Sequence, residues 1–247
     1  MKISIITVCY QSCQTLKYAI ESVLSQTRCD IEYIVVDGGS KDGTVDLIKS
    51  YSGISKWVSE PDKGIYDAMN KGILMATGDY VGFLHADDLL AHSSIISELS
   101  SLLIESQADV VYGDLEYVQK EDVTKIVRYW KSCEFVPSLL PMGWMPPHPT
   151  VYVKRELFNQ VGLFNVIYKI AADYDFMLRL FGSPSIKAAY MPQVIVKMRV
   201  GGTSNRSLIN IIKKSREDYR AIRSNKIGGV FTLFNKNFSK ISQFFKR

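Results

Sequence analysis

Two adjacent carboxylates, Asp87 and Asp88, follow an apolar run over residues 80–84. Neighbouring carboxylates at the end of a buried strand repel each other unless a cation or solvent lies between them. Mg²⁺ or Mn²⁺ takes one or two protein carboxylates and completes its coordination shell with substrate phosphates and water. The pair therefore predicts a Mg²⁺ or Mn²⁺ site for a phosphate-bearing substrate. The alternative is an acidic loop in which Asp88 caps the next helix.

A third acidic residue, Asp37, ends the apolar run of residues 31–36 and is followed by Gly38 and Gly39. Glycine lets the backbone adopt positive φ and come close to a ligand. An ionised carboxylate only accepts hydrogen bonds, which suits an imide N–H such as that of uracil. We therefore expect Asp37 to bind a nucleobase. The alternative is an Asp/Gly turn that caps the following helix.

The segment after Asp37 matches neither of two common phosphate-binding loops. Gly38 and Gly43 have the spacing of a Walker loop, but Thr44 and Val45 stand where Lys and Ser or Thr are needed. No G-x-G-x-x-G pattern occurs in the segment. P-loop enzymes and dinucleotide oxidoreductases are therefore not expected.

The elements that position these residues alternate between apolar, β-branched runs and helical patterns, which is typical of a mostly parallel sheet flanked by helices. Ligands of such open sheets bind beyond the carboxyl ends of the strands, where all three aspartates are expected to lie. The pattern predicts strands over residues 3–9, 31–36, 56–59, 80–84 and 110–112, and helices near 15–25, 45–51, 64–76 and 94–105.

The second half of the chain has a different pattern. Alternating segments between residues 115 and 149, together with the Pro-rich stretch 142–149, predict antiparallel strands and an ordered loop. Helices near 154–161 and 172–181 and strands near 187–190 and 194–200 follow. We expect this half to hold an acceptor.

The segments VDGGSKDGT and GIYDAMNKGILMATGDYVGFLHADD, in that order, resemble the inverting family 2 glycosyltransferases with the GT-A fold. Within that family the similarity is greatest to bacterial colanic-acid, exopolysaccharide and O-antigen biosynthesis enzymes. It implies a GT-A domain over residues 1–205, with an α/β, Rossmann-like, mostly parallel sheet and a small antiparallel acceptor-side sheet. Residues 1–112 would bind the nucleotide sugar and residues 113–205 the acceptor.

On the donor side, the resemblance implies that Thr7 and Asp37 hold the nucleobase. It also implies that Asp87 binds the metal as the last residue of a D-x-D motif, here His85-Ala86-Asp87. Because His85 stands where many relatives have Asp, the metal would depend chiefly on Asp87. A hydrogen-bonding role for His85 is the alternative to metal ligation.

Three further basic or acidic residues are donor-side candidates. Lys63 and Asp67 lie at the start of the predicted helix 64–76, and we expect one of them near the donor. Arg199 belongs to a cationic loop with Gly201, Gly202 and Ser204, which is suited to closing over a diphosphate. A simple turn into the C-terminal helix is the alternative for this loop.

On the acceptor side, IAADYDFMLRLF resembles the family's acidic helix, usually written Glu-Asp, in which the Asp is the general base. Ala172 replaces the Glu, which leaves Asp173 as the candidate base and Asp175 as the second choice. Such a base takes the acceptor proton while the oxygen attacks the anomeric carbon. His148 stands where relatives often carry a His near the acceptor and the diphosphate, and a structural histidine is the alternative.

The positive charge of the chain is concentrated at its C-terminal end. Residues 207–247 contain ten Lys and Arg against two acidic residues, a net charge of +8, whereas the whole chain carries +5. Apolar residues in this region recur every three or four positions between lysines: Phe231, Phe234, Phe238, Ile241 and Phe245. We interpret residues 206–247 as a basic amphipathic helical tail whose residues 228–247 contact anionic lipid. Packing on the domain, or on another subunit of a homo-oligomer, is the alternative.

The sequence also indicates where the protein is located and which partners it has. No apolar run approaches the roughly 18 to 20 residues that a spanning helix requires. The basic tail lacks a recognised nucleic-acid module, so no nucleic-acid partner is expected. We expect a cytoplasmic protein bound peripherally to the inner face of the plasma membrane.

The resemblance predicts a metal-dependent glycosyltransferase of bacterial surface polysaccharide synthesis. It would move a sugar from a nucleotide diphosphate sugar, UDP by analogy through Asp37, to a hydroxyl of a saccharide or lipid-linked acceptor. The reaction would be a single displacement with inversion. The alternatives are a nucleotidyltransferase and a non-catalytic nucleotide-sugar-binding scaffold.

Overall fold

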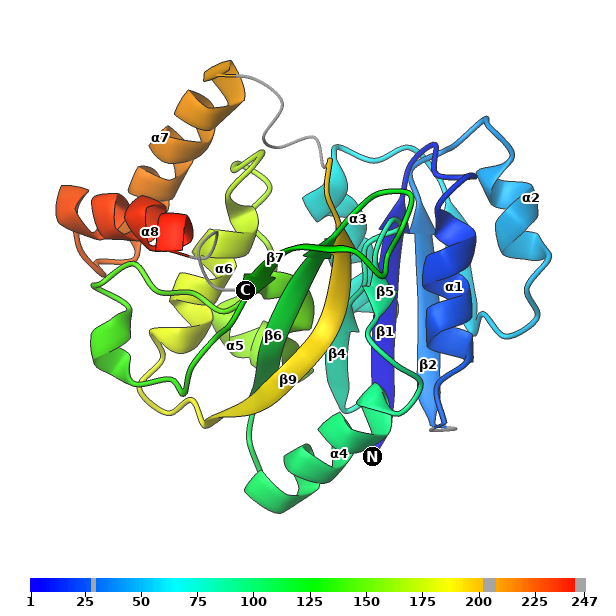
Figure 1. Cartoon of the computed structure of the whole chain (residues 1–247), viewed down its shortest axis with the longest axis horizontal. Coiled ribbons are helices and arrows are strands. Elements are labelled where there is room, and N and C mark those ends of the chain that lie inside the picture. Colours follow the sequence, from blue (N-terminus) through cyan, green and yellow to red (C-terminus); the bar gives the residue numbers. More distant parts are fainter. Residues whose placement is uncertain (28–29, 202–207, 243–247) are drawn as a thin grey trace.

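The computed structural model describes residues 1–27, 30–201 and 208–242. Its strands are β1 (Ile3–Cys9), β2 (Ile31–Asp37), β3 (Lys56–Ser59), β4 (Tyr80–Phe83), β5 (Leu89–Leu90), β6 (Val110–Val118), β7 (Ile126–Trp130), β8 (Tyr152–Lys154) and β9 (Ala188–Arg199). Within the described residues they form one nine-stranded sheet in the order β3-β2-β1-β4-β8-β6-β9-β5, with β7 paired to β6 (Figure 1).

The helices lie on both faces of this sheet. They are α1 (Leu16–Leu24), α2 (Thr44–Lys49), α3 (Ile65–Met75), α4 (Ile95–Ser106), α5 (Leu157–Val161), α6 (Ala172–Phe181), α7 (Leu208–Ser224) and α8 (Val230–Ser242), with short 3₁₀ turns at Pro137–Leu139 and His148–Thr150. α1 and α4 pack with one apolar cluster of the sheet, and α3, α5 and α6 pack with the other. The predicted α/β fold class is thereby confirmed.

The first four strands of the order are parallel, and their carboxyl ends meet at one edge. β1 lies between β2 and β4, and Cys9 at its end is paired with Asp37. Every residue of β1 is buried, as expected for a strand covered on both faces. The side chains that follow β1, β2 and β4 therefore lie near one another.

The second half continues the same sheet with antiparallel pairs and one parallel pair, that of β6 with β9. β8 lies antiparallel to both β4 and β6, and β7 lies antiparallel to β6. The small antiparallel sheet expected on the acceptor side is thus hydrogen bonded into the main sheet.

β9 is one strand where the sequence predicted two. Its pairing with β6 shifts between Met191 and Val194, around Pro192, which has no N–H to donate.

α7 and α8 are built onto the domain instead of forming a separate tail. Ala221 and Ile222 of α7 are fully buried in the core that contains α6. α8 lies so close to the Pro-rich loop that a Cβ at Gly143 would be 2.6 Å from the carbonyl oxygen of Thr232. Both helices therefore have contacts with the part of the chain that precedes residue 206.

Part of the predicted tail cannot be compared with the structure. Residues 202–207, residues 243–247 and the side chain of Ile241 lie outside the described part of the chain. Among the described residues, no helix combines the length and apolar character needed to cross a membrane.

A buried carboxylate ties the start of the sheet together. Glu32 of β2 accepts hydrogen bonds from Ser4 Oγ at 2.6 Å and from Thr77 N at 2.7 Å, and Lys56 Nζ lies 2.9 Å from it. Burial alone would raise the pKa of Glu32, but these hydrogen bonds outweigh it and hold the pKa far below its usual range. Glu32 thus joins β1, β2, β3 and the turn before β4.

Replacing Glu32 by Gln should lower the free energy of unfolding at pH 7 by about 1 to 3 kcal/mol, because charge-assisted hydrogen bonds are lost. The folded-state pKa is lowered, so ionisation of Glu32 stabilises the fold above the unfolded pKa of roughly 4.3 and does so less as pH falls. Urea titrations should therefore show a smaller gap between wild type and Glu32→Gln at pH 3 than at pH 7. Glu105→Gln, at an exposed position, should differ little from wild type in the free energy of unfolding at either pH. An equal difference between wild type and Glu32→Gln at both pH values would contradict this explanation.

Candidate active site

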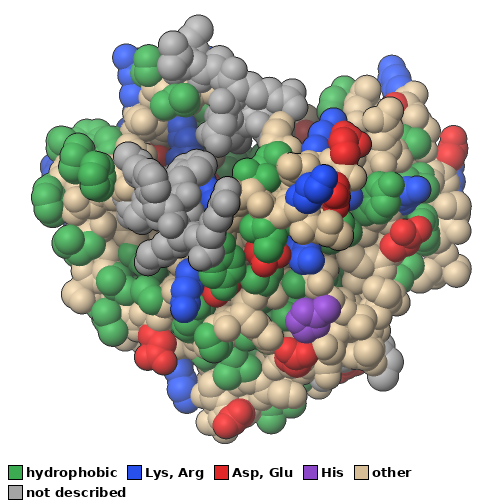
Figure 2. Space-filling model, viewed as in Figure 1, with side chains coloured by type: hydrophobic (Ala, Val, Ile, Leu, Met, Phe, Trp, Pro, Cys, Tyr) green, Lys and Arg blue, Asp and Glu red, His purple; other side chains and the backbone are tan. Residues whose placement is uncertain are grey.

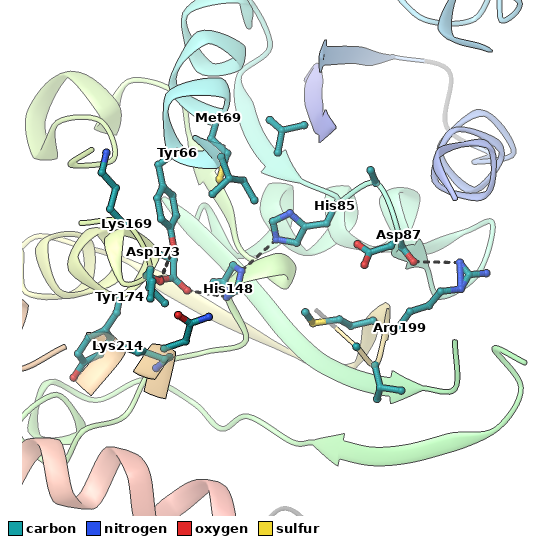
Figure 3. Close-up of a pocket in the computed structure, with 18 of the residues that line it drawn as sticks. Tyr66, Met69, His85, Asp87, His148, Lys169, Asp173, Tyr174, Arg199 and Lys214 are labelled. Atoms are coloured by element: carbon teal, nitrogen blue, oxygen red, sulfur yellow. Dashed lines mark hydrogen bonds and ion pairs between the residues drawn. The ribbon is translucent and has the colours of Figure 1, made fainter. Parts of the chain in front are cut away.

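A cleft of about 1040 Å³ opens at the carboxyl edge of the parallel strands. Its lining includes residues from the end of β1, from α3, from the loop after β4, and from α6, α7, α8 and β9. Six of the predicted site residues line it: His85, Ala86, Asp87, His148, Asp173 and Arg199. Figure 3 shows five of these labelled, spread from Asp87 and Arg199 on one side to Asp173 on the other.

The two adjacent aspartates have different surroundings. Asp87 lines the cleft with its side chain only partly buried. Asp88 is fully buried, and its Oδ1 accepts a hydrogen bond from Arg199 N at 3.2 Å. Burial, with the neighbouring charge of Asp87, raises the pKa of Asp88 well above its usual range. Of these two aspartates, only Asp87 lines the cleft.

Arg199 fixes the loop that carries Asp87. Its guanidinium donates to the carbonyl oxygens of Asp87 at 3.2 Å and Lys120 at 3.0 Å, and it lies 4.7 Å from the ring centroid of Tyr18. It is 8% exposed and lines the cleft. Gly202 and Ser204 of the predicted diphosphate loop lie outside the described residues.

A row of polar side chains crosses the cleft from this loop to α6. His85 Nε2 lies 3.3 Å from His148 Nε2, and His148 Nδ1 lies 3.2 Å from Asp173 Oδ2. Tyr66 places its hydroxyl 3.2 Å from the other oxygen of Asp173 and 2.8 Å from Ile170 O. The residues come from α3, the loop after β4, the Pro-rich loop and α6, so the row joins the two halves of the chain (Figure 3).

Asp173 is held in its ionised form. Burial would raise its pKa, but the charges of His148, Lys236 and Lys214 and the N–H of Tyr174 outweigh this, and the pKa is lowered. Asp173 also lies in the first turn of α6, where the helix dipole favours negative charge. At neutral pH its carboxylate can therefore accept a proton.

A carboxylate from α7 holds the turn that leads into α6. Glu217 accepts hydrogen bonds from the backbone N–H groups of Lys169 at 3.1 Å, Ile170 at 2.8 Å and Ala171 at 3.0 Å. These groups directly precede Asp173, so Glu217 fixes where that carboxylate points. Sequence reasoning missed Glu217, because the residues it binds are more than 40 positions away.

Five predicted residues, Asp37 among them, are not among the described residues that line the cleft. Thr7 is fully buried two residues before the end of β1, where its hydroxyl accepts a hydrogen bond from Tyr33. Asp175 points elsewhere on α6 than Asp173 does, and it pairs with Arg179 Nε at 3.0 Å. Lys63 and Asp67 instead form the start of α3, where Lys63 N donates to Asp67 Oδ2.

Asp37 lies beside the cleft but does not present its carboxylate to it. The carboxylate is fully buried and accepts hydrogen bonds from Gly39 N, Ser40 N, Ser40 Oγ and Ser59 Oγ, all between 2.5 and 3.1 Å. Burial raises its pKa, these bonds lower it, and the net pKa is lowered. Gly39, at φ +83°, gives the turn a conformation that other residues rarely adopt. In this conformation Asp37 organises the turn and leaves no carboxylate surface for a nucleobase.

The residues present fit a divalent cation that shares its ligands with a substrate. Within the described residues, no three His, Cys, Asp or Glu side chains converge as a complete cation site. Asp87 provides one hard oxygen ligand in the cleft, and burial lowers the pKa of His85, which keeps that imidazole uncharged. Mg²⁺ and Mn²⁺ bind one or two carboxylates together with substrate phosphates, so this sparse set suits them.

Comparison with known proteins gives one family and one fold. The model of Glycosyl transferase family 2 matches residues 4–165. A PGL/p-HBAD biosynthesis glycosyltransferase of Mycobacterium bovis is 31% identical over 196 residues, covering 77% of this chain and 74% of the relative. An uncharacterized glycosyltransferase of Rickettsia typhi is 29% identical over 231 residues, covering 90% and 70%.

Solved structures show the same fold at low identity. S. aureus TarS in complex with UDP-GlcNAc has a TM-score of 0.70 at 16% identity, covering 92% of this chain and 66% of that one. The mannosyltransferase PcManGT from Pyrobaculum calidifontis, in complex with GDP-Man and Mn²⁺, has a TM-score of 0.68 at 17% identity, covering 98% and 70%. This chain spans only 44% of the length of a longer TarS structure.

The ion pair between His148 and Asp173 leads to a prediction that needs no substrate. His148→Gln should raise the pKa of Asp173, because the opposing charge is lost while burial remains. A ¹³C NMR titration of the Asp173 carboxyl carbon measures this shift. His92→Gln, which changes an exposed histidine far along the chain, should leave the titration unchanged. An Asp173 curve identical in wild type and His148→Gln would show that the pair does not set this pKa.

Proposed function

The chain belongs to Glycosyl transferase family 2, an inverting family with the GT-A fold, and we propose that its cleft transfers a sugar from a nucleotide diphosphate sugar to an acceptor hydroxyl. The observation that carries this proposal is that two ionisable carboxylates with different surroundings face one cleft. Asp173 is held ionised beside His148, and Asp87 lies beyond His85 on the other side of the cleft (Figure 3). The first suits proton abstraction and the second suits a diphosphate with its cation.

In the proposed reaction Asp173 accepts the proton of the acceptor hydroxyl while that oxygen forms a bond to the anomeric carbon. The bond from the anomeric carbon to the diphosphate breaks, and the nucleoside diphosphate leaves from the opposite face, which inverts the configuration. Tyr66 and His148 hold the two oxygens of Asp173 in place. Bound Mg²⁺ or Mn²⁺ on Asp87 would supply charge neutralisation for the leaving diphosphate. Arg199 would act indirectly by fixing the backbone of Asp87.

We propose a UDP-sugar as donor. The supporting observation is the UDP-GlcNAc complex of TarS. Asp37 acts only by fixing the turn beside Cys9, which lines the cleft next to Tyr10. Tyr10 is 63% exposed there and offers a ring on which a base can stack. The Mn²⁺ in the PcManGT complex supports Mn²⁺ as the ion, with Mg²⁺ as the alternative.

We propose a saccharide or lipid-linked acceptor used in bacterial surface polysaccharide synthesis, reached at the cytoplasmic face of the membrane. An exposed apolar surface on α7 and α8 supports this. It consists of Ile211, Ile212, Tyr219, Val230, Phe231, Phe234 and Phe238, all more than a third exposed. Exposed cations of α7, among them Lys213, Arg216 and Arg220, accompany it. Figure 2 shows hydrophobic side chains gathered at the edge where α8 lies. Apolar groups flanked by cations suit an anionic lipid surface.

Asp87→Asn and Asp173→Asn should each lower transfer by about 10²- to 10⁴-fold, because each removes a charge that the reaction uses. The measurement is release of nucleoside diphosphate and of glycosylated acceptor, with a scan of nucleotide sugars and both cations. Thermal unfolding should be close to wild type, and the exposed Asp46→Asn serves as control. Near-wild-type turnover by either variant would remove that residue from the mechanism, and release of pyrophosphate would indicate nucleotidyl transfer instead.

Phe231→Ser, Phe234→Ser and Phe238→Ser combined should move the protein from liposomes that contain anionic lipid to the soluble fraction in flotation. Point changes are preferable to truncation, because α8 also carries the buried Thr232 and Lys236. Leu74→Ser, at an exposed position of α3, is the matched control and should float like wild type. Unchanged flotation of the triple variant would rule out this surface as the membrane contact. A change from dimer to monomer on gel filtration would instead identify a homo-oligomer interface.

A further inference from the structure

The C-terminal helices contact both segments that form the ion pair between His148 and Asp173. α7 packs against α6 and against α8 (Figure 1). On the Asp173 side, Glu217 of α7 accepts the three backbone N–H groups that precede α6. On the His148 side, α8 packs against the Pro-rich loop at Gly143. The two helices thus connect the loop that carries His148 with the turn before Asp173.

The contact between α8 and the Pro-rich loop is made by backbone atoms. A Cβ at Gly143 would lie 2.6 Å from Lys236 N and from Thr232 O, and 2.9 Å from Lys236 Cα. These are backbone positions, which cannot turn aside as the end of a flexible side chain can. Gly143 also has φ +79°, a conformation that other residues rarely adopt. The position of α8 therefore determines how the loop with His148 lies.

A buried ion pair joins α8 to α7 at the same point. Lys236 Nζ lies 2.5 Å from Asp218 Oδ1, and the two side chains are 2% and 1% exposed. Lys214 Nζ lies 3.0 Å from the other oxygen of Asp218. Removing one partner of a buried pair is strongly destabilising, so the pair holds the two helices in one arrangement. Asp218 directly follows Glu217, so neighbouring residues of α7 hold α8 and the turn before Asp173.

The ion pair at the end of these contacts is sensitive to small displacements. His148 Nδ1 lies 3.2 Å from Asp173 Oδ2, and a side-chain hydrogen bond no longer exists at about 3.6 Å. A movement of a few tenths of an ångström between the loop and α6 is therefore enough to break it. Contacts that fix both segments to one pair of helices limit such movement.

We propose that α7 and α8 position the proposed base, with Gly143, Asp218 and Glu217 as positioning residues that hold His148 against Asp173. The three residues act through this pair and not on the substrate. This inference rests on the function proposed above, and it gives the helix pair a role in the reaction besides the proposed contact with lipid.

The pKa of Asp173 reports on its distance from His148 when the surrounding charges stay the same. The titratable groups around Asp173 are His148 and His85 from loops, Tyr66 from α3, Lys214 and Glu217 from α7, and Lys236 from α8. Gly143→Ala changes none of these charges. A shift in the titration of Asp173 in this variant therefore comes from a change in geometry.

Gly143→Ala should push the Pro-rich loop away from α8, because the new Cβ overlaps backbone atoms. The ¹³C titration of the Asp173 carboxyl carbon should then move to higher pH, toward the curve of His148→Gln. In the His148→Gln background the same change should add little, since the pair is already absent. Gly43→Ala, at φ +94° before α2, introduces similar backbone strain and should leave the curve unchanged. A wild-type curve in folded Gly143→Ala would overturn the proposal.

Glu217→Gln provides a second test, which also applies if Gly143→Ala does not fold. Loss of a negative charge by itself can only lower the pKa of Asp173. Loss of the positioning contact should raise it, because the turn no longer holds Asp173 against His148. A raised pKa supports the proposal, and an unchanged or lowered pKa overturns it. The same sign separates the two effects in Asp218→Asn.

Activity gives a third, independent readout. Gly143→Ala should lower kcat by roughly 10- to 100-fold with little change in the KM for the donor, because the base is displaced while the donor side is intact. The acidic limb of the kcat profile should move to higher pH, as the pKa of the base rises. Wild-type kcat and acidic limb in the variant would overturn the proposal. Failure of the wild type to release nucleoside diphosphate from any donor would count against the proposed function, whereas the NMR titrations would still report on the helix pair.

Discussion

The contact between His148 and Asp173 joins the Pro-rich loop beside the sheet to the first turn of α6. His148 belongs to the Pro-rich loop beside the sheet, and Asp173 begins a helix whose preceding turn is held by α7. Burial would raise the pKa of Asp173, but the charge of His148 opposes this effect. The net pKa of Asp173 is lowered. A proposed base that is partly buried and still ionised depends on this pair, on Tyr66 and on the nearby lysines together.

The C-terminal helices are therefore part of the site as well as of the surface. α7 provides Glu217, which caps the turn before Asp173, and α7 and α8 provide the lysines that share Asp218. The other side of the same helices bears the exposed apolar residues proposed to contact lipid. The proposed lipid contact and the alignment of the proposed base thus involve one pair of helices. A lipid-linked acceptor would reach Asp173 along the same pair.

The aspartates at the carboxyl edge of the sheet differ in burial and in the hydrogen bonds that they accept. Asp37 ends β2, and Asp87 and Asp88 follow β4, yet of these three only Asp87 lines the cleft. Asp88 is buried with its pKa raised, and Asp37 is buried with its pKa lowered by four hydrogen bonds. Hydrogen-bond donors explain the difference between the two buried groups, since burial acts on both in the same direction.

The sequence by itself determined the fold class, the family and most strands and helices of the first half, because a buried parallel strand or an amphipathic helix leaves a local, periodic pattern. It also identified six residues of the cleft. Asp87 could be placed there because the carboxyl ends of parallel strands meet at one edge, whereas His148 and Asp173 were implied by the family resemblance. Only the tertiary structure decided that Thr7 and Asp175 face away, that Asp37 is enclosed, and that α7 and α8 join the site. Tyr66 contacts Asp173, Glu217 holds the turn before its helix, and the charges of Lys214 and Lys236 act on its carboxylate. Such pairings across dozens of residues leave no periodic signal in the chain.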